Sequence, residues 1–376
     1  MARGVPLWPK SPRMRYDMGM FDFMSKHIGR IVLGIVLLTS AMGVALFAHA
    51  AATGEAKTLT PTPVVVHCVG DKAMDFSCWR NHFEQITEHF GSEIALKDLT
   101  TLYARDSYVV SQCHQLTHTI GNVTADHEDI ATAFSHGDSI CWSGYYHGIV
   151  ERAVNRVGKE NFLAEADQLC AKIPGKETKN FNYYNCVHGV GHGVMAATKN
   201  ELFESLKLCD GLSGDWEQRS CYGGAFMENI MADNRNHHTD YLKKDDLMYP
   251  CNAVDQRYKE ECYKMQTSYA LSQNGRNFKN LFELCSTADV NYRNTCALSI
   301  GRDASGSSVS NKDTTIATCS LALNDDQEKY CFIGAVKDFV SYFHGDKEAR
   351  GLCDAVPAKF QESCETALIQ HLSTLK

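Results

Sequence analysis

The chain has 376 residues, of which 44% are hydrophobic, and this is enough apolar content for two or three packed domains or one extended repeat array. It carries 37 Lys and Arg against 45 Asp and Glu, but residues 1–30 hold six basic and two acidic residues, so the remainder has a net charge of −12. This acidic body excludes nucleic-acid binding as an interpretation, because such binding depends on Lys and Arg displacing counterions from phosphates.

The first segments predict membrane anchoring. Residues 31–50 are uncharged, rich in Val, Leu, Ile and Ala, and long enough to cross a hydrocarbon core of about 30 Å. The basic residues before them predict that residues 1–30 are a cytoplasmic tail and that the rest of the chain is exported. A cleavable signal peptide is the alternative, since Ala48-His49-Ala50 matches a cleavage site, but the long leader favours a retained transmembrane signal anchor. Residues 51–66, with two prolines and several threonines, predict an extended tether.

All 16 cysteines lie beyond the apolar segment, and in an exported chain they predict a disulfide framework formed in an oxidising extracytoplasmic compartment. Most fall into pairs that are 10 to 16 residues apart. Cys113 and Cys141 have no such neighbour, and the simplest interpretation is a bridge between two successive repeats. The other predicted pairs are Cys68 with Cys78, Cys170 with Cys186, Cys209 with Cys221, Cys251 with Cys262, Cys285 with Cys296, Cys319 with Cys331, and Cys353 with Cys364.

The residues around these pairs predict helical hairpins. In four pairs the first cysteine ends an apolar run with spacings of three and four, which is typical of one face of a helix. An Asp six or seven residues before the second cysteine is expected to cap the next helix. One hairpin cannot bury its apolar face alone, so stacked neighbours must complete the core. The predicted fold is therefore all-α: disulfide-stapled helical-hairpin repeats form an α-solenoid, preceded by one transmembrane helix. The capping residues expected are Asp215, Asp255, Asp289 and Asp325.

The exported part is predicted to contain four segments that differ in composition. Residues 67–112 are predicted to be cysteine-paired helices, and residues 113–232 are the histidine-bearing repeats. Residues 233–250 are rich in charged side chains and predict an exposed insertion. Residues 251–376 are predicted to be structural repeats that lack the histidines. The corresponding positions there hold Met265, Ser299 and Gly334.

Five histidines occupy equivalent positions in three successive repeats. When the repeats are aligned on their cysteines, His118, His147 and His192 share one position. His114 precedes His118 by four residues, and His188 precedes His192 by four. This spacing places two imidazoles on one helix face about 6 Å apart along the axis, which suits a shared metal.

Two glutamates extend the pattern. Glu151 follows His147 by four residues, and the next repeat offers Met227-Glu228. Glu151 and Glu228 are candidate catalytic general bases. Imidazole with carboxylate favours iron or zinc, with copper less favoured. This arrangement resembles helical-repeat di-iron hydroxylases in architecture, without sharing a motif with them. The predicted metal ligands are His114, His118, His147, Glu151, His188 and His192.

A structural interpretation of the histidines competes with the metal site. Glycine directly follows His147, His188 and His192. Because a glycine inside a helix costs ~1 kcal/mol relative to alanine, its recurrence predicts that helices approach closely here. Each histidine would then bond a neighbouring carbonyl. If the rings share metal instead, their nitrogens must lie within roughly 3–5 Å of one another.

Two functions follow from these alternatives. The first is a membrane-anchored extracytoplasmic helical-repeat protein with a His/Glu transition-metal site, either catalytic or metal-handling. The second is a metal-free interaction scaffold, tethered to the membrane through residues 31–50, whose concave face binds an exported protein partner, as solenoids commonly do.

Overall fold

The computed structural model describes residues 68–231 and 238–374, and these residues form helices without any strand. The cytoplasmic tail, the signal anchor and the tether predicted within residues 1–66 lie outside this range. Among the residues described, no helix is sufficiently long and apolar to cross a membrane. The helices are α2 (Phe76–Phe90), α3 (Ser92–Tyr103), α4 (Ser107–His127), α5 (Ile130–Ser135), α6 (Ile140–Val157), α7 (Lys159–Leu169), α8 (Phe181–Ala197), α9 (Leu202–Cys209), α10 (Asp215–Ile230), α11 (Gln256–Gln273), α12 (Phe278–Thr287), α13 (Arg293–Ser307), α14 (Lys312–Cys319), α15 (Asp325–Phe343), α16 (Lys347–Ala355) and α17 (Ala358–Leu372), with 3-10 turns η1 (Gly70–Lys72) and η2 (Val290–Tyr292).

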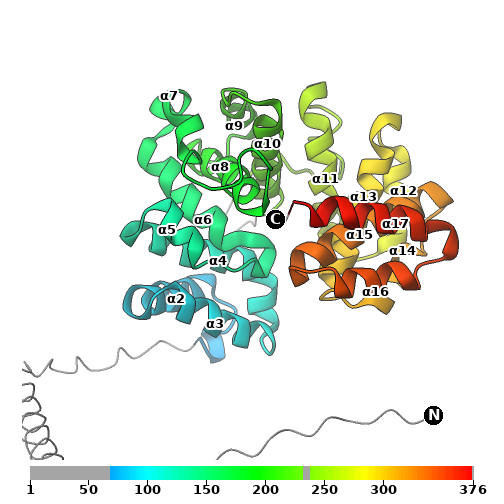
Figure 1. Ribbon diagram of the computed structural model, residues 1–376, viewed down its shortest axis with the longest axis horizontal. Helices are drawn as coiled ribbons and strands as arrows, with labels where there is room; N and C mark the ends of the chain where they lie inside the picture. Colours follow the sequence, from blue (N-terminus) through cyan, green and yellow to red (C-terminus); the bar gives the residue numbers. More distant parts are fainter. Residues whose placement is uncertain (1–67, 232–237, 375–376) are drawn as a thin grey trace, which may run out of the picture. The chain divides into compact units, whose positions relative to one another are not determined.

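Long and short helices make two layers along the array (Figure 1). The long helices have 15 to 21 residues, and each packs on the next long helix in chain order. The short helices have 6 to 12 residues, and most pack against the long helix that follows them, whereas α7 packs against the preceding long helix α6. This arrangement confirms the predicted all-α array of hairpins. The long row is α2, α4, α6, α8, α10, α11, α13, α15 and α17.

Eight disulfides join consecutive elements of the array, and no cysteine in the described part is free. All seven predicted short-range pairs are present, and Cys113 bonds Cys141 as expected. Their Cα atoms are 5.4 to 5.9 Å apart, within the range that the bond requires. Each loop of about 12 residues removes on the order of 3 kcal/mol of denatured-state freedom in the chain-entropy model. This framework indicates an oxidising extracytoplasmic compartment.

The expected aspartate caps are only partly correct. Asp289 accepts a backbone hydrogen bond at the start of η2, whereas Asp255 is an N-cap residue whose side chain makes no capping bond. Asp215 and Asp325 are the first helical residues of α10 and α15, and the capping oxygen of α15 comes from Asn324. A carboxylate in the first turn still interacts favourably with the helix dipole, which explains why these aspartates recur one residue past the cap.

The segment between α10 and α11 contains no helix over the described residues 238–255. Its end is fixed by Gln266 of α11, whose amide donates to the carbonyls of Leu247 and Tyr249 at 2.9 and 2.8 Å. Met248 between them is buried. Within the described residues, 243–245 are exposed, whereas the end of the segment is packed against α11.

The two halves of the array also touch each other. The side chains of Ser139, just before α6, and His344, at the end of α15, are hydrogen bonded. The ring of Phe181 lies 5.3 Å from that of His344, and the Trp142 indole lies against Gly306 of α13. Helices α6 and α8 of the histidine-bearing half therefore contact α13 and α15 of the C-terminal half.

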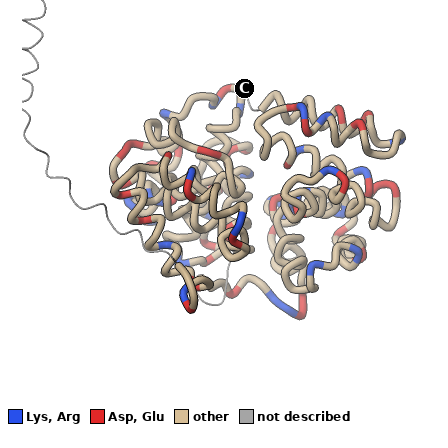
Figure 2. Tube along the Cα trace, turned by 90° about the horizontal axis from the view of Figure 1, so that it is seen from below, with Lys and Arg blue, Asp and Glu red and all other residues tan. Residues whose placement is uncertain are grey.

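Charged side chains of both signs are interspersed over both halves (Figure 2). Exposed pairs are common; for example, Asp126 binds Arg152 at 2.7 Å and Arg156 at 2.6 Å. Buried acidic residues are few within the described ranges, and each therefore requires a partner. They are Glu217, Glu228, Glu261 and Asp303.

Candidate metal centre

The residues predicted for the site lie on consecutive long helices, in positions that face one another. The elements are α4, α6, α8 and α10, each packed on the next. His114 and His118 come from α4, His147 and Glu151 from α6, His188 and His192 from α8, and Glu228 from α10.

Glycines bring these helices into close contact. A Cβ added at Gly148 would overlap the main-chain oxygen of His118, and one at Gly224 would overlap that of His188. Gly148, directly after His147, thus allows the backbone-to-backbone approach that the sequence predicted, whereas Gly189 and Gly193, after His188 and His192, make room for the side chains of Val150 and Val154. A consequence is that side chains on the facing surfaces of α4, α6 and α8 are forced into one small volume.

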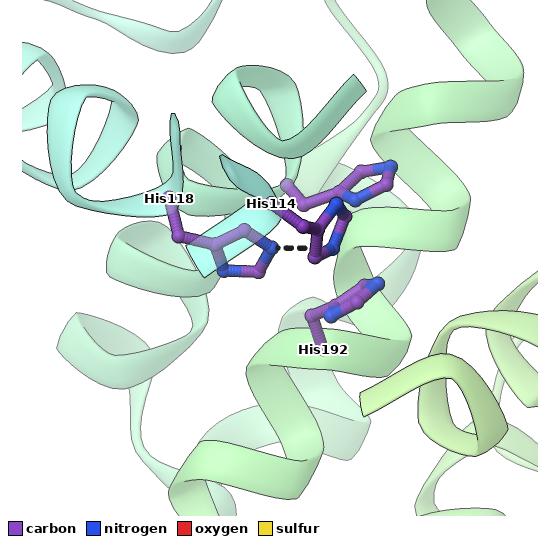
Figure 3. A group of neighbouring side chains, drawn as sticks. His114, His118 and His192 are labelled. Carbon is purple, nitrogen blue, oxygen red and sulfur yellow. Dashed lines mark hydrogen bonds between the residues drawn. The ribbon is translucent and has the colours of Figure 1, made fainter. Parts of the chain in front are cut away.

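Four imidazoles converge in that volume, and we call His114, His118, His147 and His192 the four-His centre. One ring nitrogen from each residue lies within 4.8 Å of those of the other three. Their ring centroids are 4.5 to 5.8 Å apart, and each residue is at most 3% exposed. Figure 3 shows the labelled rings pointing toward one another from α4 and α8. The nitrogen spacing meets the condition set from the sequence for shared metal binding.

Each ring of the four-His centre is oriented by an acceptor outside it. The Nδ1 atoms of His118 and His192 lie 2.9 and 2.5 Å from the carboxylates of Glu151 and Glu228. His114 Nδ1 lies 2.8 Å from the Cys141 carbonyl, and His147 Nε2 lies 3.3 Å from the Asn185 amide oxygen. Metal-binding histidines are usually held by carboxylates or carbonyls in this way, because the bond fixes the tautomer and raises the basicity of the other nitrogen.

The close contact between the His114 and His118 rings requires a proton or a metal ion between their facing nitrogens. Both Nδ1 atoms must donate, because a carbonyl and a carboxylate only accept. In neutral rings both Nε2 atoms then carry lone pairs, yet they face each other at 3.1 Å (Figure 3). Two lone pairs cannot form a hydrogen bond, so a proton or a metal ion must be shared. Two nitrogens bound tetrahedrally at 2.0–2.1 Å to one metal would be about 3.3 Å apart, close to this spacing.

The protonation of the centre favours metal-binding forms of the rings. Burial, together with the neighbouring charge of His118, lowers the pKa of His114 to about 3. Burial also lowers the pKa of His147 far below its usual value. For His118 the effect of burial is outweighed by the hydrogen bond to Glu151 together with the negative charges of Glu151 and Glu228, and its pKa is raised. A proton in the metal-free pair therefore resides on His118, whose Nε2–H donates to His114 Nε2, and a metal ion would have to displace that proton. The rings of His114 and His147 are neutral and have a lone pair to donate.

The donor set fits a divalent transition metal. His147 Nδ1 is buried and has no hydrogen-bond partner, which leaves it available to a cation. Glu151 and Glu228, each bonded to a ring, could offset the two positive charges of the ion. Comparison with protein-family models, curated proteins and solved structures found no match. The geometry of these residues is therefore the basis for assigning a function.

Three predicted site residues lie outside the four converging nitrogens. Glu151 and Glu228 stand behind His118 and His192 rather than among the nitrogens. His188 lies beside the centre, its ring 4.9 Å from that of His147, but its Nε2 is 3.3 Å from the sulfur of Met227. The roles assigned to these three from the sequence stay predictions.

Two acceptors of the site escaped the sequence analysis. Asn185 directly precedes a cysteine and has no counterpart in a repeated histidine position. The Cys141 acceptor is a main-chain carbonyl, which carries no sequence signal at all. Repeat alignment finds side chains that recur, so it could not find either group.

Proposed function

We propose that this protein is a membrane-tethered, extracytoplasmic metalloprotein that binds a divalent first-row transition metal in the four-His centre. The observation that carries the proposal is that one ring nitrogen from each of four buried histidines lies within 4.8 Å of the others, with His147 Nδ1 lacking any hydrogen-bond partner. A buried structural cluster would pair each donor or acceptor with a protein group instead. The metal-free interaction scaffold gives no reason for this convergence.

Zinc or iron suits the four-His centre best. Imidazole nitrogen binds both, and the four rings would be neutral ligands to a doubly charged ion. The hydrogen-bonded carboxylates of Glu151 and Glu228 supply compensating negative charge at the outer edge of the rings. In this proposal both glutamates position and polarise histidines instead of acting as metal ligands or general bases.

The centre favours holding a metal over hydrolysing a substrate. Catalytic zinc keeps one open position for water, whereas four protein ligands close the coordination sphere. All four histidines are also buried, so a substrate has no direct access to the ion. We therefore favour a role in metal handling or metal storage over general acid-base catalysis, whether the bound ion is zinc or iron.

The proposal also includes where the protein resides in the cell. The disulfides support an exported body, and residues 31–50 are proposed as a retained signal anchor that keeps this body at the membrane surface. A proteomic measurement of the mature N-terminus tests the anchor, because cleavage after Ala50 would contradict it.

Metal analysis of the full chain tests the centre directly. The protein is purified in detergent without a histidine tag, and its metal content is measured by mass spectrometry. We expect near-stoichiometric zinc or iron, lost in the double variant His118→Ala, His192→Ala. His82→Ala is the matched control, since His82 is equally buried but bonds Asp98 at 2.8 Å, outside the centre. Wild-type protein that is folded, fully disulfide-bonded and unable to bind either metal would leave only the interaction scaffold.

A further inference from the structure

A second pair of metal-binding side chains adjoins the four-His centre. His188 Nε2 lies 3.3 Å from the thioether sulfur of Met227, and these residues are 2% and 9% exposed. The His188 ring is 4.9 Å from that of His147 and 5.3 Å from that of His192. Met227 directly precedes Glu228, so the same turn of α10 presents a sulfur to His188 and a carboxylate to His192.

We propose that His188 and Met227 form a second metal position that selects Cu(I). This inference rests on the proposed function, because it adds an outer position to the same metal centre. Imidazole with thioether is a soft donor pair, and soft sulfur ligands select Cu(I) over harder divalent ions. The described cysteines are all oxidised to disulfides, so a methionine has to supply the soft donor.

The position can open to accept an ion. A linear N–Cu–S arrangement with bonds of roughly 2.0 and 2.3 Å needs the nitrogen and sulfur about 4.3 Å apart, so they must separate by roughly 1 Å. The Met227 side chain can supply this movement, because methionine has three rotatable bonds and tolerates repacking.

The hydrogen bonds of the His188 ring are compatible with copper on Nε2. The Tyr184 hydroxyl lies 3.2 Å from His188 Nδ1, and the ring also makes a hydrogen bond with the Ser220 backbone. A ring that donates from Nδ1 leaves the Nε2 lone pair directed at the sulfur side, where copper would bind. The tyrosine hydroxyl both donates and accepts, so it can pair with either tautomer. Tyr184 is 38% exposed, which places the copper position one aromatic ring below the surface.

Copper titration of the zinc-loaded full chain tests the proposal. Zinc occupies the four-His centre, ascorbate keeps copper reduced without cleaving disulfides, and bathocuproine disulfonate competes for Cu(I). We expect wild-type protein to take up one equivalent of Cu(I) that Met227→Leu does not, with a copper–sulfur path in X-ray absorption spectra. Met195→Leu is the control, because Met195 is a buried methionine of α8, the helix that carries His188, and is not part of the proposed pair.

The two proposals fail in different ways. Equal Cu(I) uptake by wild type and Met227→Leu, or the same loss in Met195→Leu, overturns the outer position while the zinc content stays intact. Failure of wild-type protein to hold zinc or iron overturns the four-His centre itself. Leucine conserves the volume of methionine, so unchanged zinc content in Met227→Leu also verifies that the variant is folded.

Discussion

Replacing Glu151 by glutamine separates a positioning role from a catalytic or ligand role. The Glu151 carboxylate lies 2.9 Å from His118 Nδ1. Glutamine keeps the size and an acceptor oxygen, so the ring stays oriented, but the negative charge that makes Nε2 more basic is lost. Removing such a partner typically lowers metal affinity 10- to 100-fold, which is about 1.4–2.7 kcal/mol. Because the Glu151 side chain is 21% exposed and partly screened by water, we expect a loss near tenfold.

The affinity is measured by zinc competition with a chromophoric chelator at constant pH. Glu88→Gln is the matched control, since the Glu88 carboxylate lies 2.9 Å from His127 Nε2 on the exposed surface, away from the centre. An unchanged zinc affinity in Glu151→Gln would refute the argument. So would an equal loss in Glu88→Gln, because that would mean a nonspecific effect of charge.

Other predictions concern the scaffold. Gly224→Ala is expected to destabilise the protein by about 1–3 kcal/mol, because the new Cβ overlaps a carbonyl oxygen of α8, whereas Gly351→Ala in the open surface of α16 should stabilise by ~1 kcal/mol. Urea unfolding of both variants checks this, and equal effects would contradict the close packing of α8 and α10. Burial raises the pKa of Asp338 to about 6, so the native state binds this proton more tightly than the unfolded state. Stability from this group is complete below about pH 4 and lost as pH rises through about 6, by on the order of 3 kcal/mol, and Asp338→Asn should abolish that slope in urea titrations at several pH values.

The scaffold could be predicted from the sequence because its constraints are local. A cysteine at the end of one helix and another near the start of the next are joined by a short turn, so only one pairing fits each hairpin. The bond between Cys113 and Cys141 followed by elimination, because every other cysteine already had a partner nearby in the sequence. The aspartate caps failed by one residue at Asp215 and Asp325, since a favourable carboxylate in the first turn resembles a cap in sequence.

The centre could be predicted only to the level of which histidines meet. Repetition of one position on three helices fixes the face from which the rings project. It does not fix the rotation of each ring, which depends on acceptors from other elements. His188 shows the difference: it shares the spacing of His114 relative to its partner, yet its Nε2 points to the sulfur of Met227. His147 differs again, because its Nε2 faces Asn185 and leaves Nδ1 as the available atom.

The C-terminal half provides an internal comparison for the metal interpretation. At a position equivalent to the histidines, Ser299 donates to the Lys264 carbonyl at 2.6 Å. Next to it, the two oxygens of buried Asp303 accept hydrogen bonds from Thr267 and Ser268 at 2.6 and 2.7 Å. Each of these three hydroxyl donors has an acceptor. The same packing can therefore be satisfied by ordinary polar side chains, and the converging imidazoles of the other half are not a requirement of the fold. Their convergence needs a reason specific to those residues, and the proposed metal ion supplies one.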